Sequence, residues 1–208
     1  MEMKYIIDIP EWMEDWDDLK NKKDGIYPTD ITTGSKKKVF WKCHVCNGEW
    51  STAPQYRKKN GCPYCVNFKA LPGFNDLKTL FPDIAAEWDE NKNNGLLPEN
   101  VTIGSGKNVW WICPEGHSYD MTVVERMKAK KCPYCNNRRV LRGYNDLQTL
   151  KPEIAQTWHP TLNGDFTPED VIPGTRKKVW WLCSKGHVWQ SSVEERCRSK
   201  GCPVCRNR

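Results

Sequence analysis

Residues 178–205 have the sequence KVWWLCSKGHVWQSSVEERCRSKGCPVC, and this stretch decides the fold. A Cys-x3-His pair follows a run of apolar residues, and a Cys-x2-Cys pair closes the stretch. Two ligand residues separated by two or three positions on a tight turn occupy two corners of a tetrahedron, and a second such pair occupies the other two. The stretch therefore predicts a structural zinc site, in which the protein supplies all four ligands and no position remains for a catalytic water.

The same arrangement occurs twice more in the chain, at intervals of 70 residues. The middle copy keeps the Cys/His pair, whereas the first copy has a Cys-x2-Cys pair in its place. The predicted ligands are Cys43, Cys46, Cys62 and Cys65 in copy one, Cys113, His117, Cys132 and Cys135 in copy two, and Cys183, His187, Cys202 and Cys205 in copy three. We therefore expect three structural zinc ions and three tandem domains, at residues 1–72, 73–142 and 143–208.

Composition supports metal as the main source of stability. The 208 residues include 11 Cys and 11 Trp but are only 38% hydrophobic, and modules this small rarely fold on apolar burial alone. No apolar run reaches the roughly 18 residues that a membrane span needs, and the N-terminal segment turns acidic where a signal peptide would be apolar. These features predict a cytoplasmic protein without a membrane partner, whose cysteines bind metal instead of forming disulfides.

Each copy also has a first half with helical spacing. The sequences FNDLKTLFPDIAAEW (74–88) and YNDLQTLKPEIAQTW (144–158) predict two short helices, with proline in the first turn of the second. Copy one keeps a shortened version at 10–16, and an aromatic, β-branched run before each first cysteine predicts a strand. The fold class is therefore a small, metal-stabilised α+β fold. Whether each module is a treble clef or a zinc ribbon depends on whether a helix or a hairpin follows C-P-x-C.

Charge alternates along the chain with the same period. Counting Lys and Arg against Asp and Glu, segments 36–72, 105–142 and 175–208 carry +7, +5 and +7, while the segments before them carry −5, −4 and −4. Basic surfaces of this kind are typical of contacts to phosphate. The candidate contacts are Lys36, Lys37, Lys38, Arg57, Lys58, Lys59, Lys107, Arg126, Lys128, Lys130, Lys131, Arg138, Arg139, Arg176, Lys177, Lys178, Arg196, Arg198, Lys200, Arg206 and Arg208.

Two strands carry adjacent tryptophans, Trp110-Trp111 and Trp180-Trp181. Successive side chains of a strand point to opposite faces, so we expect one ring of each pair in the core. The other ring is a candidate platform for base stacking.

The repeated strings T-P-E-D-V (167–171), V-W-W-x-C, G-H-x-W (186–189) and G-C-P-x-C (201–205) resemble a family of tandem probable zinc-ribbon or treble-clef repeats. These repeats occur in bacterial, phage and large-virus proteins, and some relatives carry them beside a nuclease domain. The resemblance covers nearly the whole chain. It implies nucleic-acid binding, with DNA preferred over RNA. Copy one departs from the pattern through its Cys-x2-Cys pair and its shortened helical half.

Three functions are compatible with these features. The first is a non-catalytic, zinc-stabilised nucleic-acid-binding protein. The second is an interaction scaffold, or an accessory subunit of a nuclease- or defence-type complex, that binds a protein partner through the acidic helical halves. The third is a nuclease of the HNH type. Such an enzyme needs histidines beyond the zinc ligands, and only His44 and His159 remain, so we expect no enzymatic activity.

Overall fold

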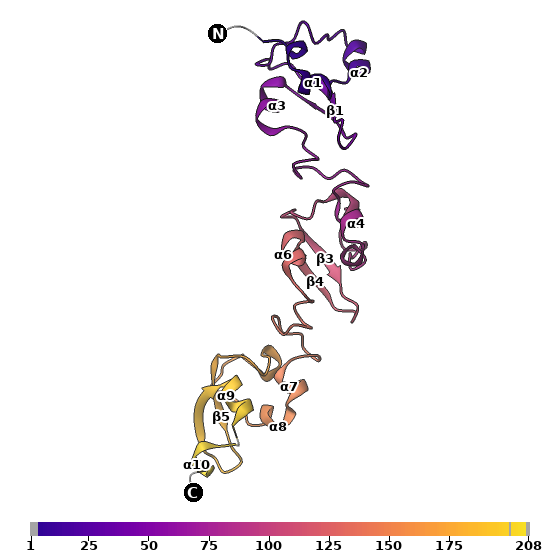
Figure 1. Cartoon of the computed structure of the whole chain (residues 1–208). Helices are drawn as coiled ribbons and strands as arrows, with labels where there is room; N and C mark the ends of the chain where they lie inside the picture. Colours follow the sequence, from indigo (N-terminus) through magenta and orange to yellow (C-terminus); the bar gives the residue numbers. More distant parts are fainter. Residues whose placement is uncertain (1–3, 200, 207–208) are drawn as a thin grey trace. The chain divides into compact units, whose positions relative to one another are not determined.

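The computed structural model describes residues 4–199 and 201–206, except for the side chains of Lys58 and Lys59. The chain forms two compact units, residues 1–130 and 131–208. Each repeat contributes one two-stranded antiparallel hairpin and several short helices (Figure 1). This composition confirms the small α+β fold class, whereas the domain boundaries at 72/73 and 142/143 stay a prediction. No helix in the described parts of the chain is both long and apolar enough to span a bilayer.

The hairpins lie where the aromatic and β-branched runs predict strands. The paired strands are β1 (Val39–Lys42) with β2 (Glu49–Thr52), β3 (Asn108–Ile112) with β4 (Ser118–Thr122), and β5 (Lys178–Leu182) with β6 (Val188–Ser192). Trp111 and Trp181 are fully buried, while Trp110 and Trp180 keep 38% and 36% of their surface exposed. The expected division of each tryptophan pair between core and surface is confirmed.

A helix follows each hairpin, at a place where the sequence indicated only a basic stretch. These helices are α3 (Pro54–Asn60), α6 (Val123–Lys128) and α9 (Val193–Arg198). Helices α6 and α9 begin with capping boxes, in which the hydroxyl of Thr122 or Ser192 accepts the amide of a glutamate three residues later. The glutamate carboxylate accepts the cap's own amide in return, so two otherwise unpaired donors are satisfied.

Two short helices form the first half of repeats 2 and 3, as predicted. They are α4 (Leu77–Leu80) and α5 (Pro82–Ala85) in repeat 2, and α7 (Leu147–Leu150) and α8 (Pro152–Ala155) in repeat 3, each pair followed by a 3-10 turn, η2 (Pro98–Asn100) or η3 (Pro168–Asp170). Proline takes the first position of the second helix, where the missing amide removes no helical hydrogen bond. Asp76 and Asp146 cap the first helix by accepting the amides of Thr79 and Thr149 at 2.9 and 2.8 Å.

The shortened helical half of repeat 1 packs on its hairpin in the same way. It consists of η1 (Ile6–Asp8), α1 (Pro10–Met13) and α2 (Asp18–Lys23). The edge of Trp16 meets the buried Trp41 ring at 5.7 Å between centroids. The matching pairs Trp88–Trp111 and Trp158–Trp181 lie at 5.2 and 5.3 Å. A perpendicular tryptophan pair therefore joins helical half to hairpin in every repeat.

A buried or half-buried asparagine joins each helical half to the exposed edge of its strand. Its side-chain Nδ2 donates to the backbone carbonyl of a strand residue, and its Oδ1 accepts a hydrogen bond from the backbone amide of the same residue. All six distances are 2.8–2.9 Å. The pairs are Asn21 with Phe40, Asn93 with Trp110, and Asn163 with Trp180. Each carbonyl also accepts a backbone amide of the helical half, so the asparagine extends the one-residue β-bridge between the helical half and the strand.

A second asparagine binds the chain segment that leaves the preceding C-P-x-C. The Asn75 amide donates to the carbonyls of Tyr64 and Lys69 at 2.7 and 2.9 Å, and its oxygen accepts the amide of Leu71 at 2.7 Å. Asn145 makes the equivalent bonds with the carbonyls of Tyr134 and Arg139 and the amide of Leu141. The first residues of one repeat therefore hold the last residues of the previous one.

The chain after C-P-x-C turns helically. In repeat 3 it forms α10 (Pro203–Arg206), and in repeats 1 and 2 the amides of Val66 and Asn136 return to the carbonyls of Cys62 and Cys132. A helical turn at this point favours a treble clef over a ribbon.

Candidate metal centres

The first cluster contains four cysteines from two separate turns. Cys43 directly follows β1 and Cys46 lies in the hairpin turn, while Cys62 and Cys65 follow α3. The Sγ atoms of Cys43 and Cys65 lie 3.6 Å apart, as do those of Cys46 and Cys62. Sulfurs at about 2.3 Å from a tetrahedral zinc are separated by about 3.8 Å, so the thiols are already close to the geometry that a zinc ion requires.

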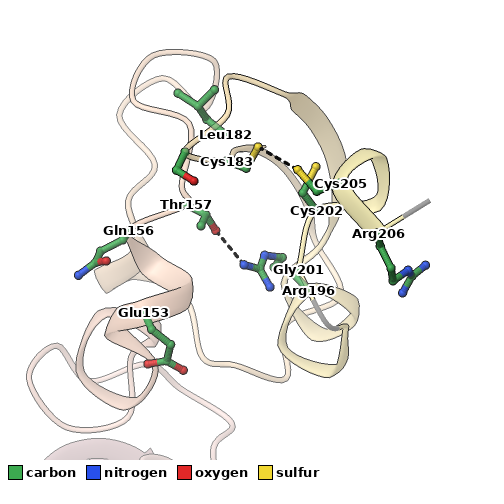
Figure 2. Close-up of a pocket in the computed structure, with 11 residues that line it drawn as sticks. Glu153, Gln156, Thr157, Leu182, Cys183, Arg196, Gly201, Cys202, Cys205 and Arg206 are labelled. Atoms are coloured by element: carbon green, nitrogen blue, oxygen red, sulfur yellow. Dashed lines mark hydrogen bonds between the residues drawn. The ribbon is translucent and has the colours of Figure 1, made fainter. Parts of the chain in front are cut away.

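The second and third clusters each combine three cysteines with a histidine that presents Nδ1. Cys113 Sγ lies 3.5 Å from His117 Nδ1, and Cys183 Sγ lies 3.4 Å from His187 Nδ1. In each of the three clusters, all four ligand atoms lie within 4.8 Å of one another. Figure 2 shows the three cysteines of the third cluster, Cys183, Cys202 and Cys205. All twelve predicted ligands are therefore assembled in three sets, as the spacing predicts.

The turn between the first two ligands requires a left-handed backbone. Gly116 and Gly186 both adopt φ of 80°, which lets the chain return so that Cys113 and Cys183 donate their amides to the carbonyls of His117 and His187. In repeat 1 the reversal comes directly after the second ligand, where Asn47 adopts φ of 58° and Cys43 donates its amide to the carbonyl of Gly48. Glycine and asparagine are the residues that tolerate this conformation.

These donor sets fit structural zinc. Thiolate sulfur and imidazole nitrogen are the ligands that zinc prefers, and four protein ligands complete a tetrahedral shell. Each zinc would join the hairpin turn to the segment after the following helix, which are otherwise separate in sequence. The metal therefore supplies cross-links that the small cores lack.

A comparison with known protein families matches residues 12–67, 84–138 and 154–208 to a domain described as a probable treble-clef zinc finger. The chain belongs to this zinc finger family. The three matches also agree with the three ligand sets. This treble-clef protein is similar to an uncharacterized protein of Acanthamoeba polyphaga mimivirus, with 22% identity over 183 residues that cover 79% of this chain and 44% of the relative. The chain thus spans under half the length of that relative.

Three basic residues predicted to contact nucleic acid are buried in this zinc finger protein. Arg57, Arg126 and Arg196 expose only 7%, 5% and 8% of their surface. Their guanidinium carbons lie 4.3, 6.0 and 5.8 Å from the ring centroids of the fully buried tryptophans Trp41, Trp111 and Trp181. The prediction that these arginines belong to an exposed basic surface is wrong, because each one is part of its module's core.

Carboxylates balance two of these arginines. Arg57 Nη2 donates to Asp15 Oδ2 at 2.5 Å, and Arg126 makes a two-point contact with Glu87, at 2.7 Å from Nη2 and 3.1 Å from Nε. Burial acts to lower the pKa of Arg126, but the hydrogen bond to Glu87 and the nearby negative charge outweigh it and raise that pKa. The guanidinium therefore stays charged inside the module.

His44 also belongs to the ion pair of repeat 1. Its ring Nδ1 and its backbone amide lie 2.7 and 2.8 Å from Asp15 Oδ1. Burial acts to raise the pKa of Asp15, but hydrogen bonds from Arg57 and His44 outweigh it and lower that pKa. The hydrogen bond to Asp15 raises the pKa of His44 in turn. His44 is half exposed, yet it has a defined structural partner.

The remaining predicted contacts that the structure describes are exposed. They are Lys36, Lys37, Lys38, Lys107, Lys128, Lys130, Lys131, Arg138, Arg139, Arg176, Lys177, Lys178, Arg198 and Arg206. At least one of them already forms an ion pair within the protein, since Arg198 Nη2 lies 2.7 Å from Glu194 Oε1. The side chains of Lys58 and Lys59, together with Lys200 and Arg208, lie outside the described part of the chain.

Native mass spectrometry of this zinc finger protein will find three zinc ions per chain, because three complete ligand sets are present. Replacing Cys62 by Ser will lower the count to two, since it removes one ligand from the first set alone. A wild-type count of two or fewer would contradict the assignment of at least one cluster.

Proposed function

We propose that this protein binds nucleic acid, preferably DNA, through the exposed basic residues beside its zinc modules. The observation that carries the proposal is their recurrence. Exposed lysines or arginines lie just before or at the start of the first strand of each repeat, at Lys36–Lys38, Lys107 and 176–178. Each group is exposed to solvent beside a β-hairpin. Membership of a zinc finger family supports a non-catalytic binding role.

The chemistry of such contacts determines how binding would behave. Lysine and arginine side chains on a surface contact phosphates and not base edges, so sequence preference would be weak. Each phosphate contact releases condensed counterions, which makes affinity fall steeply with salt. Three linked modules would add their contributions, because the second and third contacts form within one complex.

Salt titration tests this proposal. We expect the zinc-loaded protein to bind random duplex DNA at low salt, with an affinity that falls by orders of magnitude between 50 and 200 mM salt. Replacing Lys128, Lys130 and Lys131 by Gln will reduce the slope of log affinity against log salt by about 1 for each phosphate that these side chains neutralise. Fluorescence anisotropy measures both quantities, and the zinc content of the variant will stay at three.

A charge-matched control variant separates a local effect from net charge. Lys22, Lys23 and Lys78 are exposed and lie in the acidic helical halves. Their replacement by Gln changes net charge equally and should leave the salt slope unchanged. If both variants lost the same affinity for DNA, the binding surface would not include Lys128, Lys130 and Lys131. If no DNA or RNA binds at low salt, the alternative function is favoured, namely a scaffold or accessory subunit that binds a protein partner through the acidic helical halves.

A further inference from the structure

Repeat 3 lacks an acid that repeats 1 and 2 share. The residue before the helical-half tryptophan is Asp15 in repeat 1 and Glu87 in repeat 2, and both carboxylates pair with the buried arginine. The corresponding residue in repeat 3 is Thr157, whose hydroxyl lies 3.3 Å from Arg196 Nη2. A neutral hydroxyl therefore stands where the other two modules have a negative charge.

Arg196 is consequently buried without a counterion. It exposes 8% of its surface, and no ion pair forms between it and any residue that the structure describes. Its Nε is fully buried and has no hydrogen-bond partner. Burying a guanidinium without a paired anion is unfavourable. The zinc sites do not account for the difference, since repeats 2 and 3 use the same set of three cysteines and one histidine.

A cleft opens directly beside this arginine. It has a volume of about 720 Å³, and it lies between helix α8 with the residues after it and the zinc turns. Figure 2 shows the Arg196 guanidinium pointing toward the hydroxyl of Thr157. The lining also includes the zinc ligands Cys183, Cys202 and Cys205. Ser184 and Arg206 add a hydroxyl and a second cation, and the exposed Glu153 adds an acid. The related cleft of repeat 1 is about 380 Å³ and contains Asp15 itself.

We propose that the cleft of repeat 3 is an oxyanion-binding site that takes a phosphate group. The ligand's oxygens would occupy the place of the Asp15 and Glu87 carboxylates and accept hydrogen bonds from the Arg196 guanidinium. The Thr157 hydroxyl already donates to the carbonyl of Ile154 at 2.7 Å, so it leaves the guanidinium without a charged partner and is not itself a donor to the ligand. Arginine presents several donors in a planar fork that matches phosphate geometry. Phosphate is favoured over a carboxylate because the cleft is lined by two arginines and a serine hydroxyl, Arg196, Arg206 and Ser184, which offer donors to more than two ligand oxygens. The site does not depend on the proposed function, since a free phosphate would satisfy it.

The test is a titration of the zinc-loaded protein with inorganic phosphate at constant ionic strength, followed by NMR of the arginine Nε–Hε signals. We expect the Arg196 signal to shift and saturate. Replacing Thr157 by Glu restores the acid of repeat 2 and should weaken phosphate binding by about tenfold or more, because the cleft's donors then have an internal acceptor. The same variant should keep its zinc and unfold at a higher temperature.

The control variant is Thr161→Glu, which adds the same charge at an exposed position of repeat 3 and should leave phosphate binding intact. If the chemical shift of the Arg196 signal does not change when phosphate is added to the wild-type chain, the proposal is overturned. If that signal then moves in Glu153→Gln without phosphate, Glu153 is the internal counterion. Binding of acetate but not phosphate overturns the choice of ligand.

Oligonucleotides with and without a 5′-phosphate distinguish the two sources of the phosphate group. A preference for the phosphorylated strand that disappears in Thr157→Glu identifies a strand end as the ligand. Binding of inorganic phosphate without such a preference identifies a free phosphate compound. Both results support the site, and neither depends on the contacts of Lys128, Lys130 and Lys131, so this proposal and the proposed function can fail separately.

Discussion

Removal of zinc with a chelator will unfold most of the chain. Each module has a small core around a fully buried tryptophan, Trp41, Trp111 or Trp181. The apolar surface buried in so small a core does not offset the entropy of ordering the chain. Structural zinc contributes roughly 10–16 kcal/mol per site in comparable small domains, which is as large as the whole free energy of unfolding of a typical domain. We expect the near-ultraviolet circular dichroism of the tryptophans to collapse and backbone amides to lose protection from hydrogen exchange.

Restoring zinc should recover the spectrum, whereas magnesium should not, because magnesium prefers oxygen ligands. The cysteines must be kept reduced during the experiment, so that disulfides do not replace the metal. A chain that stays compact with an unchanged tryptophan spectrum after complete loss of zinc would show that the metal is not the main source of stability.

Replacing Glu87 by Ala will destabilise repeat 2 by about 3–5 kcal/mol, the usual effect of removing one partner from a buried ion pair. The side chains of Arg126 and Glu87 are only 7% and 15% exposed, so the arginine would keep its charge inside the core without compensation. Glu87 also accepts a hydrogen bond from Tyr119 at 3.2 Å. Urea unfolding of the zinc-loaded protein, followed by tryptophan fluorescence, measures the loss.

Glu90 supplies the matched control, because it is an exposed glutamate of the same helical half. Its replacement by Ala should change the free energy of unfolding by less than about 0.5 kcal/mol. A loss of under about 1 kcal/mol in Glu87→Ala, the value typical of an exposed ion pair, would mean that water reaches the Arg126 guanidinium.

Features that depend on local sequence were predictable. The ligand sets follow from spacing alone, since two residues between cysteines, or three between a cysteine and a histidine, fit one turn of chain. The division of Trp110 from Trp111 follows from strand alternation, and the break between α4 and α5 follows from Pro82. These inferences need no knowledge of which segments meet in space.

The buried arginines were not predictable from the repeat frame. The turn between the two strands of repeat 1, residues 43–48, is one residue longer than the matching turn at 113–117, so the helix after it matches at an interval of 69 and not 70. A strict interval of 70 therefore pairs Arg57 with Met127 and hides its equivalence to Arg126. The basic character of the segment also masked helices α3, α6 and α9. One sequence feature could have indicated them. An acidic residue, Asp15 or Glu87, directly precedes Trp16 and Trp88, and it is explained by an ion pair with the buried arginine.

The bonds of Asn75 and Asn145 also determine where this chain can be divided. A fragment that ended at residue 72 would lose the amide that holds the carbonyls of Tyr64 and Lys69, and its last zinc turn would have a free tail. A fragment that keeps these hydrogen bonds must therefore extend beyond one sequence repeat. It must include the asparagine near the start of the following repeat. Recombination that shuffles these copies would keep them intact only if its crossover points lay beyond the asparagine.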